Sequence, residues 1–285
     1  MNAKILNDFN NAIKDSVPNK DTQEVSPNRH YYKDDYLKPV QLYYCLTNRK
    51  SNEFARIDTS SGIRPYKMAS VCSSARLCFI RLAEEANVIF EYHLLNCTSK
   101  SEIWEKPNRN DTQLDAFDGE TFYECKCQEI FHDKGYLSKS YKPFLRKYLG
   151  LTEIRDDGKN IVGSPKELKI EIENVKDYRK TYFDLKQLFT HLCAINKEAH
   201  KTGNRYLLKY IFFKPSQTYI DKNNDIAKAY ETLEKEIQAI KKSDIFKNAN
   251  NFVDFDYEYV FVDSESMKKD PKIIFFKKYK EYLRK

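Results

Sequence analysis

The run from Leu114 to Gln128 constrains the fold more than any other segment, because it has the pattern of a tight β-hairpin. Two apolar stretches meet at a glycine, and Gly119 at the first position of a two-residue loop suits a type II′ turn. Side chains two residues apart in a strand point to the same face. Glu124, Lys126 and Gln128 are therefore predicted to share one face of the second strand.

The register of this hairpin decides which acidic side chain lies beside Glu124. If the loop begins at Gly119, Asp115 faces Glu124 across the two strands, with Cβ atoms about 5 Å apart. If the loop begins at Asp118 as a type I′ turn, Asp115 lies diagonal to Glu124, and Asp118 is the alternative acid. Two carboxylates so close repel each other unless a cation lies between them. Mg²⁺ prefers one or two carboxylates plus water and phosphate oxygens, so the hairpin predicts a magnesium site beside Lys126.

Other segments predict the elements around this hairpin. Helical spacing of apolar residues predicts helices over 75–86 and 183–201, and apolar runs predict strands over 88–95 and 205–213. The predicted order is helix, strand, strand, strand, helix, strand. Glu85 borders the apolar face of the first helix, where a carboxylate is unfavourable unless it is paired, bound to a metal or able to reach water.

This order of elements, together with the acidic pair and the lysine, resembles the PD-(D/E)xK nuclease superfamily over about residues 70–215. The resemblance implies an α/β fold with a restriction-endonuclease-like core, in which helices flank a central mixed β-sheet. We expect a polar N-terminal arm over 1–40 and one domain over 41–285, with an insertion at about 131–180. A C-terminal extension with a helix and a strand is expected over 216–285.

The resemblance also implies roles for individual residues. Asp115, Glu124 and the backbone of Cys125 would bind Mg²⁺, which Mn²⁺ can replace, and Lys126 would be catalytic. Many members add a glutamate from the first helix, for which Glu85 is the best match and would act as both ligand and catalytic group. The chain departs from the family pattern because no proline precedes Asp115 and a long stretch separates the hairpin from the second helix.

Some exonuclease branches of the superfamily carry a Gln-x-x-x-Tyr motif on the second helix. Gln187 and His191 have this spacing but lack the tyrosine. A helical wheel places both away from the apolar stripe, so we predict that they are surface residues.

A basic and aromatic segment follows the hairpin and is a candidate nucleic-acid contact. The residues expected to contact nucleic acid are Gln128, Lys134, Lys139, Lys142 and Arg146. The alternative interpretation of this segment is an amphipathic helix with a solvated basic face. The net charge of +7 is mild, so it suits nucleic acid without requiring it.

The remaining composition excludes several classes of protein. The chain contains neither GxxxxGK[ST] nor GxGxxG, which argues against a glycine-rich phosphate loop. Its seven cysteines are odd in number and include no CxxC pair, so a structural zinc site is not expected. This pattern favours reduced thiols in a cytoplasm. The sequence predicts no signal peptide and no membrane span.

These observations favour a metal-dependent DNA endonuclease that hydrolyses phosphodiester bonds, for which the restriction type is one form, with RNA not excluded as substrate. Because cleavage of both strands of a duplex often uses two active sites, a homodimer is compatible with this expectation. The alternatives are a nucleic-acid-binding protein without catalysis on the same fold, and a cytoplasmic protein-interaction module.

Overall fold

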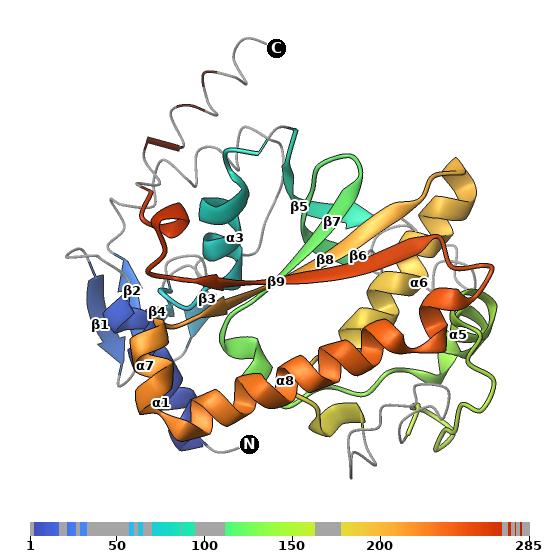
Figure 1. The fold of residues 1–285 in the computed structure, drawn as a ribbon, viewed down its shortest axis with the longest axis horizontal. Helices are drawn as coiled ribbons and strands as arrows, with labels where there is room; N and C mark the ends of the chain where they lie inside the picture. The colour runs from blue at the N-terminus through green and yellow to red at the C-terminus, as the bar shows by residue number, and fades with distance from the viewer. Residues whose placement is uncertain are drawn as a thin grey trace.

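The protein is a mixed α/β structure built on one five-stranded sheet (Figure 1). The computed structural model describes residues 3–16, 22–26, 29–32, 57–59, 62–64, 70–85, 87–94, 112–162 and 178–269, and positions 273, 274, 277 and 280. The strands of the main sheet follow the order β5 (Ile89–Leu94), β6 (Thr112–Phe117), β7 (Thr121–Lys126), β8 (Tyr206–Lys214) and β9 (Val253–Phe261). β5, β6 and β7 pair antiparallel, whereas β7, β8 and β9 pair parallel.

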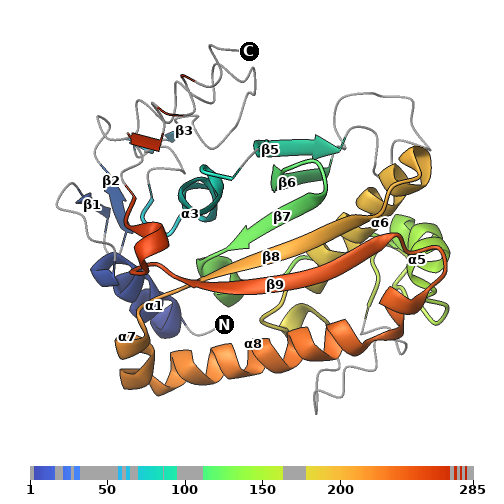
Figure 2. The ribbon, with the colours of Figure 1, turned by 45° about the horizontal axis from the view of Figure 1, so that its top comes forward.

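Helices cover both faces of this sheet. α3 (Ser74–Leu82) lies on one face, and α6 (Leu185–Thr202) and α8 (Asn224–Lys242) lie on the other (Figure 2). Other helices in the described part of the chain are α1 (Ala3–Ser16), α5 (Lys142–Leu149) and α7 (Gln217–Lys222). Two small hairpins are also present: β1 (Thr22–Ser26) pairs with β2 (Arg29–Tyr32), and β3 (Ile57–Thr59) pairs with β4 (Gly62–Arg64). Short 3₁₀ turns lie at Gln128–Phe131 (η3), Lys139–Tyr141 (η4), Tyr178–Lys180 (η5), Asp244–Lys247 (η6) and Glu265–Met267 (η7).

The main helices begin at residues that cap them. The side chain of Ser73 accepts a hydrogen bond from the backbone N–H of Arg76 at the start of α3, and Asp184 does the same for Gln187 at the start of α6. Gly203 ends α6 in the left-handed conformation, with φ of +75°. The predicted order of helices and strands around the hairpin is therefore confirmed, with boundaries shifted by a few residues.

Two further predictions concern the ends of the chain. Helix α1 packs on the body through the buried Phe9, whose ring centroid lies 4.9 Å from that of Phe131. Residues 3–16 thus belong to the folded body rather than to a separate polar arm. The apolar run at 273–276 also predicts a strand near the C-terminus, but Ile273 and Ile274 are helical, so that prediction is wrong. Residues 33–40 of the expected arm and 163–177 of the expected insertion lie outside the described residues.

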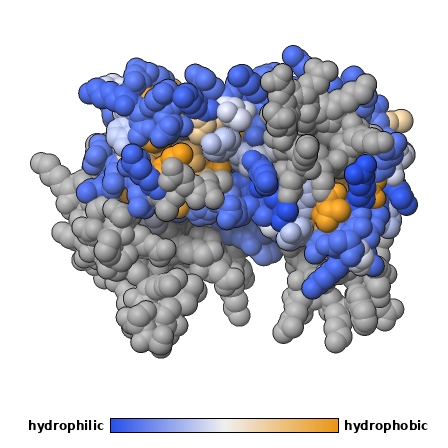
Figure 3. Space-filling model, turned by 90° about the horizontal axis from the view of Figure 1, so that it is seen from below, coloured by the Kyte–Doolittle hydropathy of each residue, from blue (hydrophilic) through white to orange (hydrophobic). Residues whose placement is uncertain are grey.

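The surface shown in Figure 3 is mostly hydrophilic, with a few small and separate apolar patches. The described residues include no helix that is long and apolar enough to cross a membrane.

Candidate functional site

The hairpin adopts the register in which Asp115 lies opposite Glu124. The paired residues of β6 and β7 are Ala116 with Tyr123 and Phe117 with Phe122. The N–H of Asp118 donates to the carbonyl of Thr121 over 3.2 Å, which closes a loop of Gly119 and Glu120. Gly119 has φ of +111°, a value that favours glycine, and Glu120 is not in the left-handed region. The loop therefore begins at Gly119, and the type I′ alternative is wrong.

Asp118 serves this turn. Its Oδ1 accepts hydrogen bonds from the N–H groups of Glu120, at 2.9 Å, and Thr121, at 2.7 Å. Its Oδ2 accepts from the hydroxyl of Tyr123 at 2.7 Å. All these contacts are local, so Asp118 stabilises the hairpin turn and is not the acid that faces Glu124.

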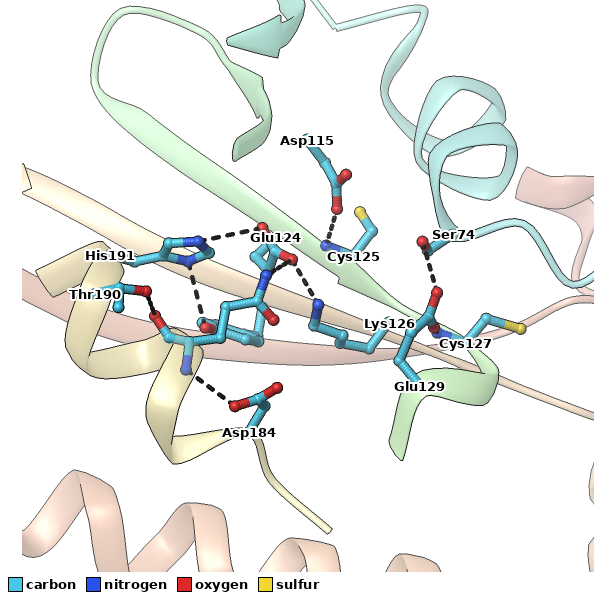
Figure 4. Close-up of polar contacts among 12 residues, drawn as sticks. Ser74, Asp115, Glu124, Cys125, Lys126, Cys127, Glu129, Asp184, Thr190 and His191 are labelled. Atoms are coloured by element: carbon cyan, nitrogen blue, oxygen red, sulfur yellow. Dashed lines mark hydrogen bonds and ion pairs between the residues drawn. The ribbon is translucent and has the colours of Figure 1, made fainter. Parts of the chain in front are cut away.

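The carboxylate of Asp115 occupies a place where the two strands separate. Its Oδ2 accepts a hydrogen bond of 2.6 Å from the backbone N–H of Cys125, which replaces a ladder bond between β6 and β7 (Figure 4). The pKa of Asp115 is raised well above its ordinary value, first by burial and then by the negative charge of Glu124, against which Lys126 acts. Asp115 is therefore a carboxylate held where its charge is poorly compensated.

Glu124 is the centre of the cluster and is only 4 % exposed. Its Oε1 accepts hydrogen bonds from Nζ of Lys126 at 2.6 Å and from Nε2 of Gln187 at 2.7 Å. Its Oε2 lies 3.9 Å from Nε2 of His191 (Figure 4). Strand β7 thus supplies the acid and the lysine, and α6 supplies an amide and an imidazole.

Lys126 lies among three acidic side chains. Burial by itself lowers the pKa of Lys126, but the charges of Glu124, Glu129 and Asp115 raise it above its ordinary value. Glu129 is fixed at this position because its carboxylate accepts hydrogen bonds from the hydroxyl of Ser74, at 3.0 Å, and from the N–H of Cys127, at 2.7 Å. Lys126 is therefore a protonated ammonium at neutral pH.

His191 is buried, so the prediction that it is a surface residue is wrong, whereas Gln187 is half-buried and contacts Glu124. His191 is 3 % exposed, and its Nδ1 lies 3.5 Å from the hydroxyl of Tyr210 on β8. Burial lowers the pKa of His191, which keeps the imidazole neutral. The apolar stripe of α6 does not show this burial, because α6 covers the polar row of β7 as well as the apolar core. The Gln-x-x-x-His spacing was the available signal.

The acid that accompanies Asp115 and Glu124 is Glu91 rather than Glu85. Glu85 lies beyond the end of α3 with a side chain 54 % exposed, paired with Arg81 at 3.2 Å. Glu91 on β5 is 2 % exposed and accepts a hydrogen bond from the side-chain amide of Gln113. The pairing of neighbouring residues between β5 and β6 places Glu91 opposite Asp115, whose pKa it helps to raise.

Glu91 also has an unusual backbone, with φ of +52°. A non-glycine residue in this left-handed region costs about 1–3 kcal/mol and persists only where its surroundings hold it. The available sequence signal for Glu91 is an acid between two aromatic residues, Phe90 and Tyr92, in an apolar strand.

The residues expected to contact nucleic acid do not form one surface. Gln128 lies in η3, beyond the end of β7, and does not continue its polar row. Lys134 is 8 % exposed, and its Nζ donates to the carbonyls of Glu129 at 2.7 Å and Ile130 at 3.3 Å, so it is an internal cation rather than a phosphate contact. Lys142 pairs with Asp156, whereas Lys139 and Arg146 are exposed.

The oxygen atoms of Asp115, Glu124 and the Cys125 carbonyl are ligands of the kind that a hard cation prefers. In the described part of the chain, no group of three or more His, Cys, Asp or Glu side chains is arranged to hold a metal ion. Mg²⁺ does not need such a group, because two carboxylates and a carbonyl leave positions for water and phosphate oxygens. The facing pair of Asp115 and Glu124, with the backbone of Cys125 between them, fits this requirement. Burial raises the pKa of the Cys125 and Cys127 thiols, so these residues serve core packing.

Comparisons of this chain with protein-family models, with curated proteins and with solved structures gave no match.

Proposed function

We propose that the protein is a Mg²⁺-dependent nuclease of the restriction-endonuclease-like type, which hydrolyses phosphodiester bonds in DNA. The observation that carries the proposal is the pair of Asp115 and Glu124, which face each other where β6 and β7 separate, with Lys126 on Glu124. A structural hairpin gains nothing from a second buried acid, Asp115, placed opposite the paired Glu124, because the repulsion between the two carboxylates destabilises the fold.

Each residue of the cluster has a role in this chemistry. Asp115, Glu124 and the carbonyl of Cys125 would hold the cation, which supplies Lewis-acid polarisation of a phosphodiester oxygen and a more acidic bound water. Lys126 orients the attacking water and stabilises the negative charge that develops on the phosphate. Gln187 donates to Glu124 and fixes its orientation, as a partner of a metal-binding carboxylate does.

The experiment that tests the proposal is cleavage of supercoiled plasmid by the purified protein with Mg²⁺, with Mn²⁺ and with EDTA. We expect nicked or linear products only with a divalent cation, and none from Lys126→Ala. Lys201→Ala is the matched control, because this lysine is 77 % exposed at the far end of α6. A parallel reaction with single-stranded RNA separates deoxyribonuclease from ribonuclease activity.

Binding of Mn²⁺, measured by calorimetry, separates loss of chemistry from loss of the site. Lys126→Ala should still bind the cation, because the carboxylates and the carbonyl remain. Full cleavage by Lys126→Ala, or equal cleavage with EDTA, would refute the proposal. Cation and DNA binding without any cleavage would favour a nucleic-acid-binding protein on the same architecture.

A further inference from the structure

A partly exposed aromatic ring, that of Tyr136, follows the glycine that Lys186 of α6 overlies. The large apolar side chains that are exposed within the described residues are Ile89, Tyr136 and Ile273, and Tyr136 has 47 % of its surface exposed. The guanidinium carbon of Arg179 lies 4.0 Å from the centroid of its ring. An exposed aromatic ring stacked with arginine offers a flat surface that a nucleobase can extend.

The backbone on both sides of Tyr136 is fixed. The N–H of Leu137 donates to the hydroxyl of Tyr178 over 2.8 Å, and that hydroxyl donates to the carbonyl of Ile161. On the other side, the buried Nζ of Lys134 donates to carbonyls of the turn that follows β7. The ring is therefore presented by an ordered segment, so binding to it would cost little ordering entropy.

This segment runs along the first turn of α6. A Cβ atom added at Gly135 would lie 2.9 Å from Nζ of Lys186, so the Lys186 side chain crosses over Gly135. The next residue of α6, Gln187, donates to Glu124. Tyr136 thus follows the glycine that Lys186 overlies, and Lys186 precedes the residue of α6 that contacts the acidic pair.

The cations around the ring suit a phosphate. Arg179 and Lys180 are consecutive, and Lys180 is exposed. Lys186 lies over Gly135, the residue that precedes Tyr136. Asp184, the nearest acid of α6, is occupied as the helix cap through its bond to the N–H of Gln187.

We propose that Tyr136, Arg179 and Lys186 form a subsite for an unpaired nucleobase and its adjoining phosphate, beside the Asp115–Glu124 pair. Stacking requires a base that is not paired within a duplex, so the preferred substrate has a single-stranded stretch at this point. The inference deepens the proposed function and rests on it, because it identifies the ligand of that site as a nucleic acid.

The test is the binding of fluorescein-labelled oligonucleotides in EDTA, followed by anisotropy, so that no cleavage is involved. Oligo-dT, oligo-U and a duplex of equal length are compared, and the first two arms separate DNA from RNA. We expect tighter binding of a single strand than of the duplex. Tyr136→Ala should weaken single-strand binding roughly 5- to 100-fold, whereas Tyr136→Phe should keep it.

Lys186→Ala tests the phosphate contact independently. It should lower the slope of log Kd against log salt by about 0.7, the value for one phosphate contact on a single strand. Lys201→Ala should leave affinity and slope unchanged. Because Tyr136 and Lys186 carry little core packing, thermal melting of each variant should match the wild type and confirm that the fold is intact.

A photocrosslink locates the base directly. A 5-iodouracil-containing oligonucleotide should crosslink at Tyr136, as identified by mass spectrometry of the tryptic peptide. Wild-type affinity in Tyr136→Ala, equal binding of the duplex, or a crosslink only elsewhere would overturn the inference. Tyr136-dependent binding without cleavage would support the subsite and refute the nuclease, whereas cleavage with unchanged Tyr136→Ala binding would do the reverse.

Discussion

At the scale of single residues, the two aspartates of the hairpin have different tasks. Asp115 lies opposite Glu124 and accepts a bond from the next strand, whereas Asp118 holds the turn through three local hydrogen bonds. Their spacing in the sequence left open which aspartate faces Glu124, and the register of β6 and β7 separates them.

This difference predicts opposite thermal behaviour for the two substitutions. Mg²⁺ at one hundred times its Kd should stabilise the wild type by about 2.7 kcal/mol. Asp115→Asn should lose most of this gain, because it removes one charged ligand. Asp118→Ala should keep the gain but lower the baseline stability by about 1–2 kcal/mol, because it leaves donors of the turn unpaired. Thermal melts with EDTA and with Mg²⁺ measure both effects, and loss of the gain in Asp118→Ala alone would contradict the assignment.

Gln187 gives a second prediction at this scale. Gln187→Ala removes the 2.7 Å bond to Glu124 and leaves both carboxylates in place. We expect kcat for plasmid cleavage to fall roughly 10- to 100-fold, as for other partners of metal ligands, with KM little changed. Lys201→Ala on the same helix is the control. An unchanged kcat would show that Glu124 keeps its orientation without the amide.

At the scale of elements, α8 is joined to the start of α6 by one buried carboxylate. Glu236 is 1 % exposed, and its oxygens accept hydrogen bonds from the N–H groups of Tyr182 at 3.1 Å and Phe183 at 2.7 Å. Burial raises the pKa of Glu236 to about 7, although these hydrogen bonds and the charge of Lys134 act against the rise. The segment that leads into α6 therefore depends on a group that titrates near neutral pH.

The sign of the resulting pH dependence follows from the raised pKa. The folded protein binds the proton more tightly than the unfolded chain, so stability is highest below the unfolded pKa and is lost as pH rises towards 7. The loss from this group is about 1 kcal/mol per pH unit between pH 5 and 7. In urea titrations at pH 5 to 7, Glu236→Gln should lack the loss of unfolding free energy that the wild type shows as pH rises. The exposed Glu231→Gln on the same helix should retain it, and parallel curves for all three proteins would refute the account.

At the scale of the whole molecule, α1 closes the body between η3 and α8. Phe9, Ala12 and Ile13 are fully buried, the hydroxyl of Ser16 accepts from the N–H of Ser216 at 3.1 Å, and the hydroxyl of Tyr219 donates to the carbonyl of Asp8 at 2.9 Å. The N-terminal helix is thus joined to a segment far away in the sequence.

A core substitution in α1 tests this attachment. Phe9→Ala should cost about 3–5 kcal/mol through lost burial and the cavity left behind. The melting temperature should fall by roughly 10 °C, whereas the exposed Asn7→Ala should leave it unchanged. A similar melting temperature for Phe9→Ala and the wild type would mean that α1 is dispensable for the fold.

Local sequence patterns predict the elements whose formation depends on residues close together in the chain. The capped helices, the alternating strand β9 and the hairpin with Gly119 all follow from spacing and turn chemistry. Burial of polar side chains does not follow, because it depends on which element covers them. His191 was predicted to lie at the surface but is buried where α6 covers β7, and Glu91 is buried within β5.

The left-handed backbone of Glu91 has a further consequence for how copies of the protein meet. Within the described sheet, β5 is an outer strand, whose free edge is a template for pairing with another chain. A strained residue with a buried charge in the middle of such a strand interrupts its regular ladder. Regular pairing of a second copy along β5 would require this residue to change its backbone, so within the described sheet Glu91 makes β5 a poor template for edge-to-edge pairing.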